Sequence, residues 1–508
     1  MMSRSAPISV TLGELLGDMV CPRGLFKTPI SALCQDSRKV QPGNLFFALS
    51  GANTSGTEYI AEASERGAVA VAIDADDQDT LTTLDPRLPM IPISNLAMSL
   101  SGLAAKFYQM PSKDLRTIAV TGTNGKTSCC WMLSHLLEFL GDPSAYLGTL
   151  GYGLARRGEN ELPDVAFQET GYTTPDAITT QRILAELRDS GARCVALEAS
   201  SHGLLQGRIE AVGVDTAIFT NLSRDHLDYH QDMDSYGEAK ARLFQMPGLR
   251  QAVINYDDSF GRKLVTRMSS SVATYTYSLD NPKADVFCTS VDLNAQGIKA
   301  SVTTPWGSGE LCSQLVGQFN LANVLAVLAA TGAHYPFGSI LRHIPSLRPA
   351  AGRMELVDTA HGPSVVVDFA HTPDALEKVL ITLRAHCRAK IWVVFGCGGE
   401  RDIGKRAKMG SIAERYADRV VLTSDNPRTE SEHAIIAHIE RGIMGRASVE
   451  IDRRAAIRRA IFSASSEDMV LIAGKGHEGY QQLADRRLSF SDQVQARLAL
   501  RDRQVAPL

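Results

Sequence analysis

The segment TGTNGKTS, at residues 121–128, combines glycines, a lysine and a threonine in a pattern suited to holding a triphosphate. Gly122 and Gly125 let the backbone turn tightly and bring its N–H groups close to phosphate oxygens. Lys126 supplies a positive charge for the β- and γ-phosphates, and the hydroxyl of Thr127 can bind Mg²⁺. An apolar strand pattern precedes the segment and a helical pattern follows it, which is the context that a phosphate loop requires. The sequence therefore predicts an ATP site, although only two residues separate the glycines. A glycine-rich turn with a chance GKT is the alternative.

Two further side chains that suit metal chemistry follow predicted strands. Glu198 ends the apolar run CVALE, and His226 comes shortly after the run ending TNL. In a doubly wound sheet both would lie near the phosphate loop, where a carboxylate can bind Mg²⁺. Taken alone, such a glutamate is more often a cap or an ion-pair partner, and such a histidine usually makes one local hydrogen bond. The triplet SSH at residues 200–202 could suggest a hydrolase, but it lacks the GxSxG turn of that class.

The last part of the chain repeats one design. VVVDFAH, IWVVFGCGG, RVVLTSDNPR and MVLIAGKGHE are apolar strands that each end in polar or glycine-rich residues. Ligands of open parallel sheets bind at the carboxyl ends of the strands, so this edge is a predicted binding site. Within DNPR, Arg428 offers a planar fork for a carboxylate, whereas the alternative is an Asx-Pro turn with a solvent-exposed arginine.

Alternating strand and helix patterns predict an α/β protein with mainly parallel sheets. Strands are expected at residues 44–49, 214–222 and 251–257, a helix at 98–108, and alternating β structure at 284–315. The helix after the phosphate loop is predicted to be amphipathic, and the DSR triplet at 36–38 and residues 51–56 to be surface loops. Met110-Pro111 and the glycine and proline cluster near 345–352 are candidate boundaries. We therefore expect domains at 1–110, 111–347 and 348–508.

Composition narrows the classes of function. The 508 residues are 44% hydrophobic and 21% charged, with a net charge of -4, so no basic surface for nucleic acid or membrane is indicated. The nine cysteines include no CxxC pair, which is typical of a reducing compartment. No signal-peptide pattern or long apolar run occurs. These features predict a cytoplasmic protein.

The chain resembles the Mur ligase family. The motifs DSR, TGTNGKTS, TTP, EASSHGL, TNLSRDHLDYH, GQFNLAN, GRME, VDFAHTPDAL, GCGGERDIGKR, DNPR and GKGHE occur in family order over most of the length. The resemblance implies an N-terminal domain for a UDP-sugar, a central P-loop-type ATPase and a C-terminal Rossmann-like domain that binds the amino acid. Two positions depart from the family pattern: Gly479 stands where Asp is usual, and Tyr172 stands where many relatives carry a polar residue.

The resemblance also implies a reaction. ATP would phosphorylate the terminal carboxylate of UDP-N-acetylmuramoyl-L-alanyl-D-glutamate, and the amine of meso-2,6-diaminopimelate would displace the phosphate, in peptidoglycan precursor synthesis. DNPR marks the diaminopimelate-adding members, and a monomer is expected. The rivals are a lysine-adding muramyl ligase, a ligase resembling folylpolyglutamate synthase and, in another class, an ATPase that acts as a nucleotide-dependent switch.

By resemblance, each site can be placed on particular residues. Catalysis falls to Lys126, Glu198, His226 and Lys240, with two Mg²⁺ ions held by Thr127, Glu198, His226 and Lys240 if that lysine is carbamylated. The ATP-binding residues are Gly122, Thr123, Asn124, Gly125, Lys126, Thr127, Ser128, Asn320, Asn323, Arg353, Asp368 and His371. The UDP-sugar-peptide residues are Ser37, Ala52, Asn53, Thr54, Thr173, Thr174, Ser200, Gln206 and Arg208. The diaminopimelate residues are Arg401, Asp425, Asn426, Pro427, Arg428, Gly474 and Glu478. Taken alone, Lys240 reads as a solvated surface lysine, Asn323 as a helix residue and Asp368 as a helix cap.

Overall fold

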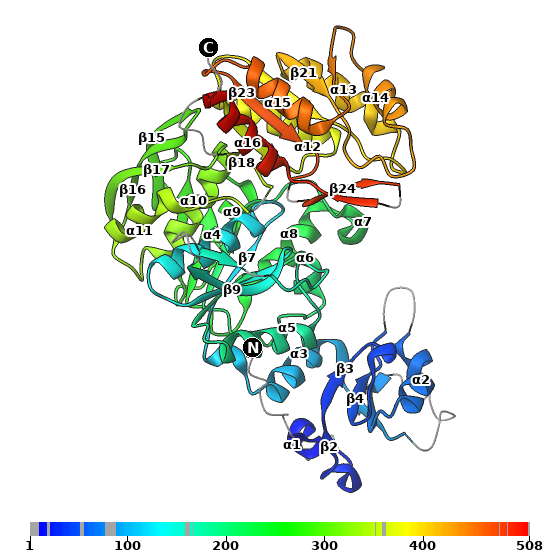
Figure 1. Cartoon of the computed structure of the whole chain (residues 1–508). Helices are drawn as coiled ribbons and strands as arrows, with labels where there is room; N and C mark the ends of the chain where they lie inside the picture. Colours follow the sequence, from blue (N-terminus) through cyan, green and yellow to red (C-terminus); the bar gives the residue numbers. More distant parts are fainter. Residues whose placement is uncertain are drawn as a thin grey trace. The chain divides into compact units, whose positions relative to one another are not determined.

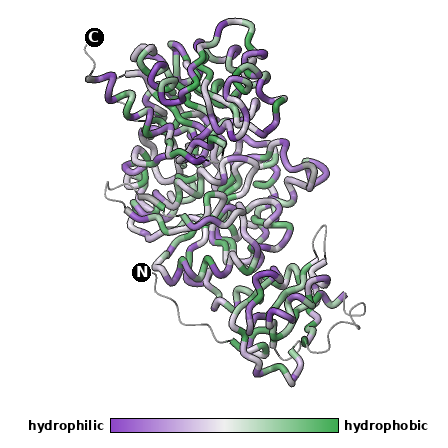
Figure 2. The backbone as a smooth tube through the Cα atoms, turned by 45° about the vertical axis from the view of Figure 1, so that its right-hand side comes forward, coloured by the Kyte–Doolittle hydropathy of each residue, from purple (hydrophilic) through white to green (hydrophobic). Residues whose placement is uncertain are grey.

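A computed structural model describes residues 10–17, 21–50, 55–76, 88–157, 163–165, 167–350, 352–357, 362–476, 478–484 and 486–505. The chain forms two compact units, Met1–Thr276 and Tyr277–Leu508, whose elements are labelled in Figure 1. In Figure 2 hydrophobic stretches run through the inside of each unit, and many outer turns are hydrophilic. No helix among the described residues has the length and apolar character needed to cross a membrane.

The first unit begins with a small parallel sheet. Its strands are β3 (Ala32–Cys34), β4 (Asn44–Phe47), β5 (Ala70–Asp74) and β6 (Met90–Ile93), in that order. Alternate residues of β4 face opposite layers, because Phe47 packs with α1 (Leu12–Leu16) and α3 (Leu96–Phe107) while Phe46 packs with α2 (Ile60–Glu65). The short strands β1 (Val10–Thr11) and β2 (Pro29–Ile30) form a separate pair.

The second sheet of this unit carries the phosphate loop. Parallel neighbours run in the order β8 (Ser144–Gly148), β11 (Cys194–Glu198), β7 (Arg116–Thr121), β12 (Thr216–Phe219) and β13 (Gln251–Asn255). Antiparallel β9 (Gly151–Arg157) and β10 (Pro163–Val165) extend the β8 edge, and β14 (Ala273–Ser278) follows β13. The helices are α4 (Lys126–Phe139), α5 (Ala177–Asp189), α6 (Ser201–Leu205), α7 (Leu227–His230), α8 (Met233–Ala241) and α9 (Ser259–Val265). The mainly parallel α/β architecture is confirmed.

Three local predictions in the first unit are wrong. Helix α4 is not amphipathic: every residue from Cys129 to Leu137 is buried, because the helix contacts β8 and β11 and also β9 and β10. The DSR triplet lies at the surface with Arg38 exposed, but it is not a loop, since it leads into the 3-10 helix η2 (Ser37–Lys39), which buries Ser37. Strand β12 is shorter than expected and stops at Phe219, where the following side chains turn toward the phosphate loop.

The second unit starts with antiparallel strands and two helices. The strands β15 (Val286–Asn294), β16 (Gly297–Thr304) and β17 (Gly307–Ser313) confirm the predicted alternating β structure. The helices α10 (Gln318–Thr331) and α11 (Phe337–His343) follow.

A six-stranded sheet forms the rest of this unit. Its order is β18 (Glu355–Val357), β19 (Ser364–Asp368), β23 (Met469–Ala473), β20 (Ile391–Phe395), β21 (Arg419–Leu422) and β22 (Ser448–Val449). One face packs against α12 (Pro373–His386), α13 (Gly404–Tyr416) and α14 (Glu432–Glu440), the other against α15 (Arg453–Ser463) and α16 (Asp492–Val505) (Figure 1). β24 (Tyr480–Leu483) and β25 (Arg486–Ser489) form a hairpin. Because β19, β23, β20 and β21 are parallel neighbours, the predicted alignment of their four polar ends is confirmed.

Candidate active site

The phosphate loop joins β7 to α4 through two glycines in unusual conformations. Gly122 has a φ of 147°, and a Cβ there would lie 1.9 Å from Thr220 Oγ1. Gly125 has a φ of 88° and directly precedes the first residue of α4. Side chains are excluded at the first position by contact and disfavoured at the second by backbone strain. The loop glycines are therefore required by the local geometry.

The chain after β12 holds this loop in place. The Thr123 amide donates to the Asn221 carbonyl at 2.8 Å, and the Asn124 amide donates to Asn221 Oδ1 at 3.0 Å. Thr220 Oγ1 in turn donates to the Asn124 carbonyl at 2.5 Å. Sequence reasoning assigned no role to Thr220 or Asn221, although both belong to the TNLSRDHLDYH motif.

Two lysine amino groups share one backbone oxygen. Lys126 Nζ lies 2.8 Å and Lys240 Nζ 2.9 Å from the Gly122 carbonyl oxygen. Lys240 is only 1% exposed, so reading it as a solvated surface residue is wrong. Burial lowers its pKa to about 6, and the charge of Lys126 adds to the effect. Burial also lowers the pKa of Lys126. A neutral Lys240 amine is the form that can react with carbon dioxide.

Glu198 is a buried carboxylate saturated with hydrogen-bond donors. It accepts from Thr127 Oγ1 at 3.0 Å, from the Thr149 amide at 3.0 Å and hydroxyl at 3.1 Å, and from the Tyr146 hydroxyl. Burial, followed by the charge of Glu198, raises the pKa of Tyr146. Gly148 permits this arrangement, because a Cβ there would lie 2.2 Å from Glu198 Oε1.

The donor set fits the expected metal. The adjacent Thr127 hydroxyl and Glu198 carboxylate are oxygen ligands of the kind that Mg²⁺ prefers when it bridges protein and nucleotide. Within the described part of the chain, no group of three or more His, Cys, Asp or Glu side chains is suited to a metal ion. Thr127 and Glu198 would supply part of the octahedral oxygen shell of Mg²⁺, which in nucleotide sites is completed by phosphate oxygens and water.

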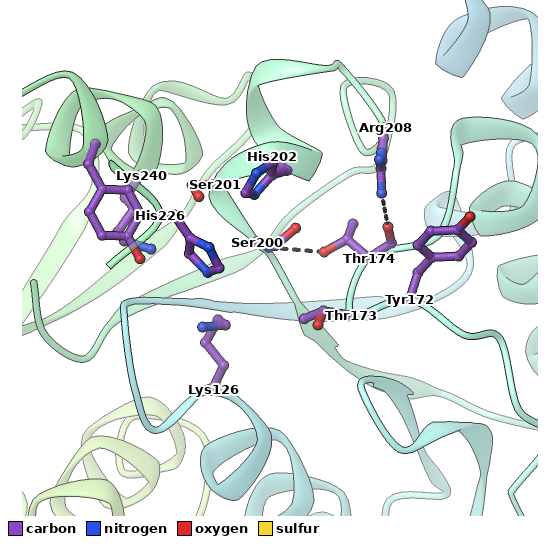
Figure 3. A pocket seen from close by; sticks show the side chains of 11 residues that line it. Lys126, Tyr172, Thr173, Thr174, Ser200, Ser201, His202, Arg208, His226 and Lys240 are labelled. Carbon is purple, nitrogen blue, oxygen red and sulfur yellow. Dashed lines mark hydrogen bonds between the residues drawn. The ribbon is translucent and has the colours of Figure 1, made fainter. Parts of the chain in front are cut away.

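A cavity of about 290 Å³ opens beside these groups (Figure 3). Seven predicted site residues line it: Lys126, Thr173, Thr174, Ser200, Arg208, His226 and Lys240. Sequence reasoning missed four others: Tyr172, Ser201, His202 and Tyr236. Tyr172, which departs from the family pattern, lines this cavity, and its ring centre lies 5.8 Å from the Arg208 guanidinium.

Arg208 is fixed by neighbours on both sides. Its Nη1 donates to the Thr174 carbonyl at 2.6 Å, and its Nε donates to Gln206 Oε1 at 3.0 Å (Figure 3 draws the first). Thr174 Oγ1 donates to the Glu198 carbonyl at 2.7 Å and accepts from the Ser200 amide. These hydrogen bonds link the predicted sugar-peptide residues to the end of β11, the strand that carries Glu198: Thr174, Ser200, Gln206 and Arg208.

The histidines of this region form an aromatic cluster. His226 has a φ of 51°, and its ring lies 5.2 Å from that of His202, which also stacks on Tyr229 at 4.1 Å. Ser200 Oγ accepts from the Gly203 amide at 3.1 Å, which makes it the N-cap of α6. A serine engaged as a helix cap gives no support to the hydrolase alternative.

The remaining predicted residues of the first unit lie apart from the cavity or outside the described residues. Ser37 donates to Glu62 Oε2 at 2.6 Å in the small N-terminal sheet region. Ser128 lies in the first turn of α4. Ala52, Asn53 and Thr54 lie outside the described residues.

In the second unit, the loops after β20 and β21 bring two arginines together. A Cβ on Gly398 would lie 3.0 Å from Arg428 Nη1 and 3.8 Å from Arg401 Cγ, so both side chains flank this glycine. Arg428 Nη1 donates to the Gly399 carbonyl at 2.7 Å, and the Gly399 amide donates to the Asn426 carbonyl at 2.9 Å. Arg428 is partly buried, so the solvent-exposed turn alternative is wrong.

The GKGHE loop after β23 completes this cluster. Glu478 Oε2 accepts from Asn426 Nδ2 at 2.8 Å and from Lys475 Nζ at 3.1 Å. A Cβ on Gly474 would lie 2.5 Å from Asp425 Oδ2, and burial raises the pKa of Asp425. Sequence reasoning missed Lys475, which is fully buried. The GKGHE motif itself was the available signal.

The second unit also holds the predicted adenine and ribose residues, in two groups. In α10, Asn323 Nδ2 lies 3.4 Å from Asn320 Oδ1. Asp368 accepts from the Met354 and Ala370 amides, both at 2.8 Å, and so joins the GRME loop to VDFAH.

The contacts of Asp368 exclude one of its two predicted roles. It is not the cap of the next helix, because Thr372 caps α12. Burial raises the pKa of Asp368. The Arg353 guanidinium lies 5.6 Å from the Phe369 ring, and His371 Nδ1 lies 2.8 Å from the Phe369 carbonyl oxygen.

The fold and the matches to known proteins together define an ATP-dependent ligase that forms amide bonds. Residues 29–108 match the Mur ligase family, catalytic domain, residues 120–331 the Mur ligase middle domain, and residues 352–476 the Mur ligase, glutamate ligase domain. The chain therefore belongs to the Mur ligase family.

Two relatives and one solved structure that resemble this chain share the same protein name. The UDP-N-acetylmuramoyl-L-alanyl-D-glutamate--2,6-diaminopimelate ligase of Pseudomonas aeruginosa is 48% identical over 93% of this chain and 95% of its own length. The protein of the same name from Coxiella burnetii is 44% identical over 93% and 96%. A solved structure of such a ligase is 35% identical with a TM-score of 0.77, covering 98% of this chain and all 100% of the other.

Proposed function

We propose that this chain joins meso-2,6-diaminopimelate to UDP-N-acetylmuramoyl-L-alanyl-D-glutamate with ATP, through an acyl phosphate. One observation carries the choice of amino acid: Arg401 and Arg428 flank Gly398 at the carboxyl edge of a parallel sheet. Diaminopimelate differs from lysine by one carboxylate at its far end, and a pair of guanidinium groups suits that carboxylate. With lysine the arginines would face no anion, at a cost in binding free energy.

The first unit supplies the groups for the phosphoryl-transfer step. The Lys126 amino group, which here donates to the Gly122 and Thr123 carbonyls, turns to the β- and γ-phosphates when ATP binds. Asn221 aligns the loop amides. Thr127 and Glu198 would hold Mg²⁺, which would supply positive charge against the charge that develops on the transferred phosphoryl group. Arg208, fixed by Gln206 and Thr174, orients the dipeptide's carboxylate toward this point.

Bond changes in the proposed reaction balance without a protein nucleophile. The substrate carboxylate attacks the γ-phosphorus, so that an acyl phosphate forms and ADP leaves. The neutral amine of diaminopimelate then attacks the acyl carbon, and inorganic phosphate leaves as the amide bond forms. The amine's proton passes to a base or to solvent. Ser200, the tempting nucleophile, caps a helix instead.

Lys240 is proposed to react with carbon dioxide, which forms an N–C bond, releases a proton and turns a neutral amine into an anionic carbamate. Its burial at 1% exposure and its pKa of about 6 support this reaction, because the amine is neutral at physiological pH. The resulting carbamate, with His226, would provide oxygen and nitrogen ligands for a second Mg²⁺.

The architecture proposed for this reaction has three domains, at 1–110, 111–347 and 348–508, with hinges near Met110 and Pro345 that close the site against water. Scattering measurements with and without an ATP analogue and the sugar-peptide test the closure, and identical dimensions would contradict it. A monomer acting in the cytoplasm, without nucleic acid or membrane, stays a prediction from the sequence.

Phosphate release tests the function. The assay contains ATP, Mg²⁺ and UDP-N-acetylmuramoyl-L-alanyl-D-glutamate, with meso-diaminopimelate, L-lysine or no amine. Release that requires diaminopimelate is the expected result. Release with lysine would still indicate a ligase, but it would contradict the role proposed for the two arginines. Release that needs neither dipeptide nor amine would instead favour a nucleotide-dependent switch.

A further inference from the structure

A buried ion pair lies behind the two arginines of the second unit. Arg406, in α13, is fully buried, and its Nη1 lies 2.9 Å from Glu430 Oε2. Its Nη2 donates to Glu430 Oε1 at 3.1 Å, so the guanidinium and the carboxylate meet in a two-pronged contact. Such planar pairs fix relative orientation as well as distance.

The ion pair reaches both arginine-bearing loops. Arg406 Nη2 also donates to the Gly398 carbonyl at 3.2 Å, and Glu430 Oε1 accepts from the Glu400 amide at 2.6 Å. Glu400 directly precedes Arg401, and Glu430 follows Arg428 by two residues. One pair of side chains therefore connects the loop after β20 with the loop after β21.

Backbone strain shows why these loops need such a connection. Glu400 has a φ of 55° and Arg428 a φ of 52°, which is the left-handed region that side chains rarely adopt. Each such residue costs about 1 kcal/mol or more and persists only where the surroundings hold it. The hydrogen bond from the Glu400 amide to Glu430 holds the first of them directly.

The contacts of the pair are directed toward the two loops. Arg406 Nε is buried and has no hydrogen-bond partner among the described residues, although Nη1 also lies 3.0 Å from His438 Nδ1. Glu430 keeps 29% of its side chain exposed. The polar contacts of Arg406 therefore go mainly to Glu430 and to the Gly398 carbonyl, which belong to the two arginine-bearing loops.

We propose that Arg406 and Glu430 form a positioning pair, which sets the spacing of Arg401 and Arg428 and thereby the preference for an amino acid with a distal carboxylate. The inference rests on the proposed function, because it concerns the same amino-acid site. Neither Arg406 nor Glu430 contacts the substrate; they act through the loops that carry the two arginines.

The test separates positioning from stability. Glu430→Gln removes the charge and keeps the shape, so we expect the KM for diaminopimelate to rise about tenfold. The value of kcat and the KM values for ATP and the sugar-peptide should stay within about twofold, and the preference for diaminopimelate over lysine should fall. Arg406→Lys keeps the positive charge but removes the planar guanidinium, so it should also raise the KM for diaminopimelate and lower the preference over lysine.

A matched control removes a carboxylate charge elsewhere in the unit. Asp502→Asn breaks the Arg458–Asp502 pair, whose side chains are 49% and 54% exposed, and should leave every parameter unchanged. Combining Glu430→Gln with Arg428→Lys should add little to the effect of Arg428→Lys alone, because both act on one guanidinium.

Each outcome has one meaning. An unchanged diaminopimelate KM and preference in both single variants would overturn the positioning role. If all three KM values rise together and thermal stability falls, the pair has only a structural role, and the positioning role is overturned as well. If Glu430→Gln does not fold, Arg406→Lys decides by the same parameters. A wild-type enzyme without diaminopimelate-dependent turnover would instead overturn the proposed function, since the variants are compared with that turnover.

Discussion

Replacing Lys240 by methionine should make the first unit more stable while abolishing turnover. The folded chain keeps this amine neutral above pH about 6, whereas the unfolded chain protonates it up to its ordinary pKa of 10.5. Between these values the unfolded state binds one more proton, so the wild-type stability rises with pH across the window. Lys240→Met has no such proton to lose.

The size of the stability change follows from the interval between the folded and the unfolded pKa of Lys240. Because the folded chain holds the amine neutral, the free energy of unfolding is lower by about 5 kcal/mol at pH 7 and by about 2 kcal/mol at pH 9. The hydrogen bond to the Gly122 carbonyl, lost in the variant, returns about 1 kcal/mol. We therefore expect Lys240→Met to be more stable than the wild type by about 4 kcal/mol at pH 7 and by about 1 kcal/mol at pH 9.

Urea denaturation in buffers freed of carbon dioxide measures this difference. Substituting Trp306 and Trp392 by phenylalanine leaves Trp131, in α4 behind the phosphate loop, as the fluorescent reporter. Lys263→Met, at an exposed position of α9, is the control and should show no such gain. A stabilisation by Lys240→Met that is equal at pH 7 and pH 9, or a destabilisation at pH 7, would refute the reasoning.

Three further substitutions probe the two sites. Glu198→Gln places an amide N–H among four donors and removes a metal ligand, so kcat for phosphate release should fall by about 100-fold or more; a wild-type rate would contradict the role of Glu198. Arg428→Lys should lower the ratio of kcat/KM for diaminopimelate to that for lysine by about tenfold or more, and an unchanged ratio would argue against Arg428 as the discriminator. Gly148→Ala should destabilise the fold by about 1–3 kcal/mol in thermal unfolding, because its Cβ would meet Glu198. Gly102→Ala, which meets open space in α3, should not, and equal effects of the two would discount the contact.

Much of the fold was predictable because it depends on local patterns. The apolar run before TGTNGKTS and the four apolar strands ending in polar residues specify parallel strands whatever their partners are. The chemistry of the phosphate loop follows from its own residue types, and the fork of Arg428 from its side chain. These predictions needed no knowledge of distant contacts.

Features that depend on distant contacts were not predictable. The segment SYGEAKARLF gives no sign that Lys240 is buried, because Glu238 and Arg242 stand two positions away on either side and the contacts that bury the amine come from elsewhere in the chain. The partner of Arg406 lies 24 residues away, and that of Asn124 lies 97 residues away. Helix α4 looked amphipathic because β9 and β10, which cover it, are themselves specified elsewhere in the chain. Packing, rather than propensity, decided each case.

The absence of a side chain at Gly398 has an evolutionary consequence. Both Arg401 and Arg428 pass within 4 Å of the space where a Cβ would be, and Arg428 approaches it to 3.0 Å. A single mutation to a larger residue would fill this space without removing either arginine. Under the role proposed for the two arginines, a single nucleotide change at this glycine would therefore alter amino-acid preference before any charged residue is replaced.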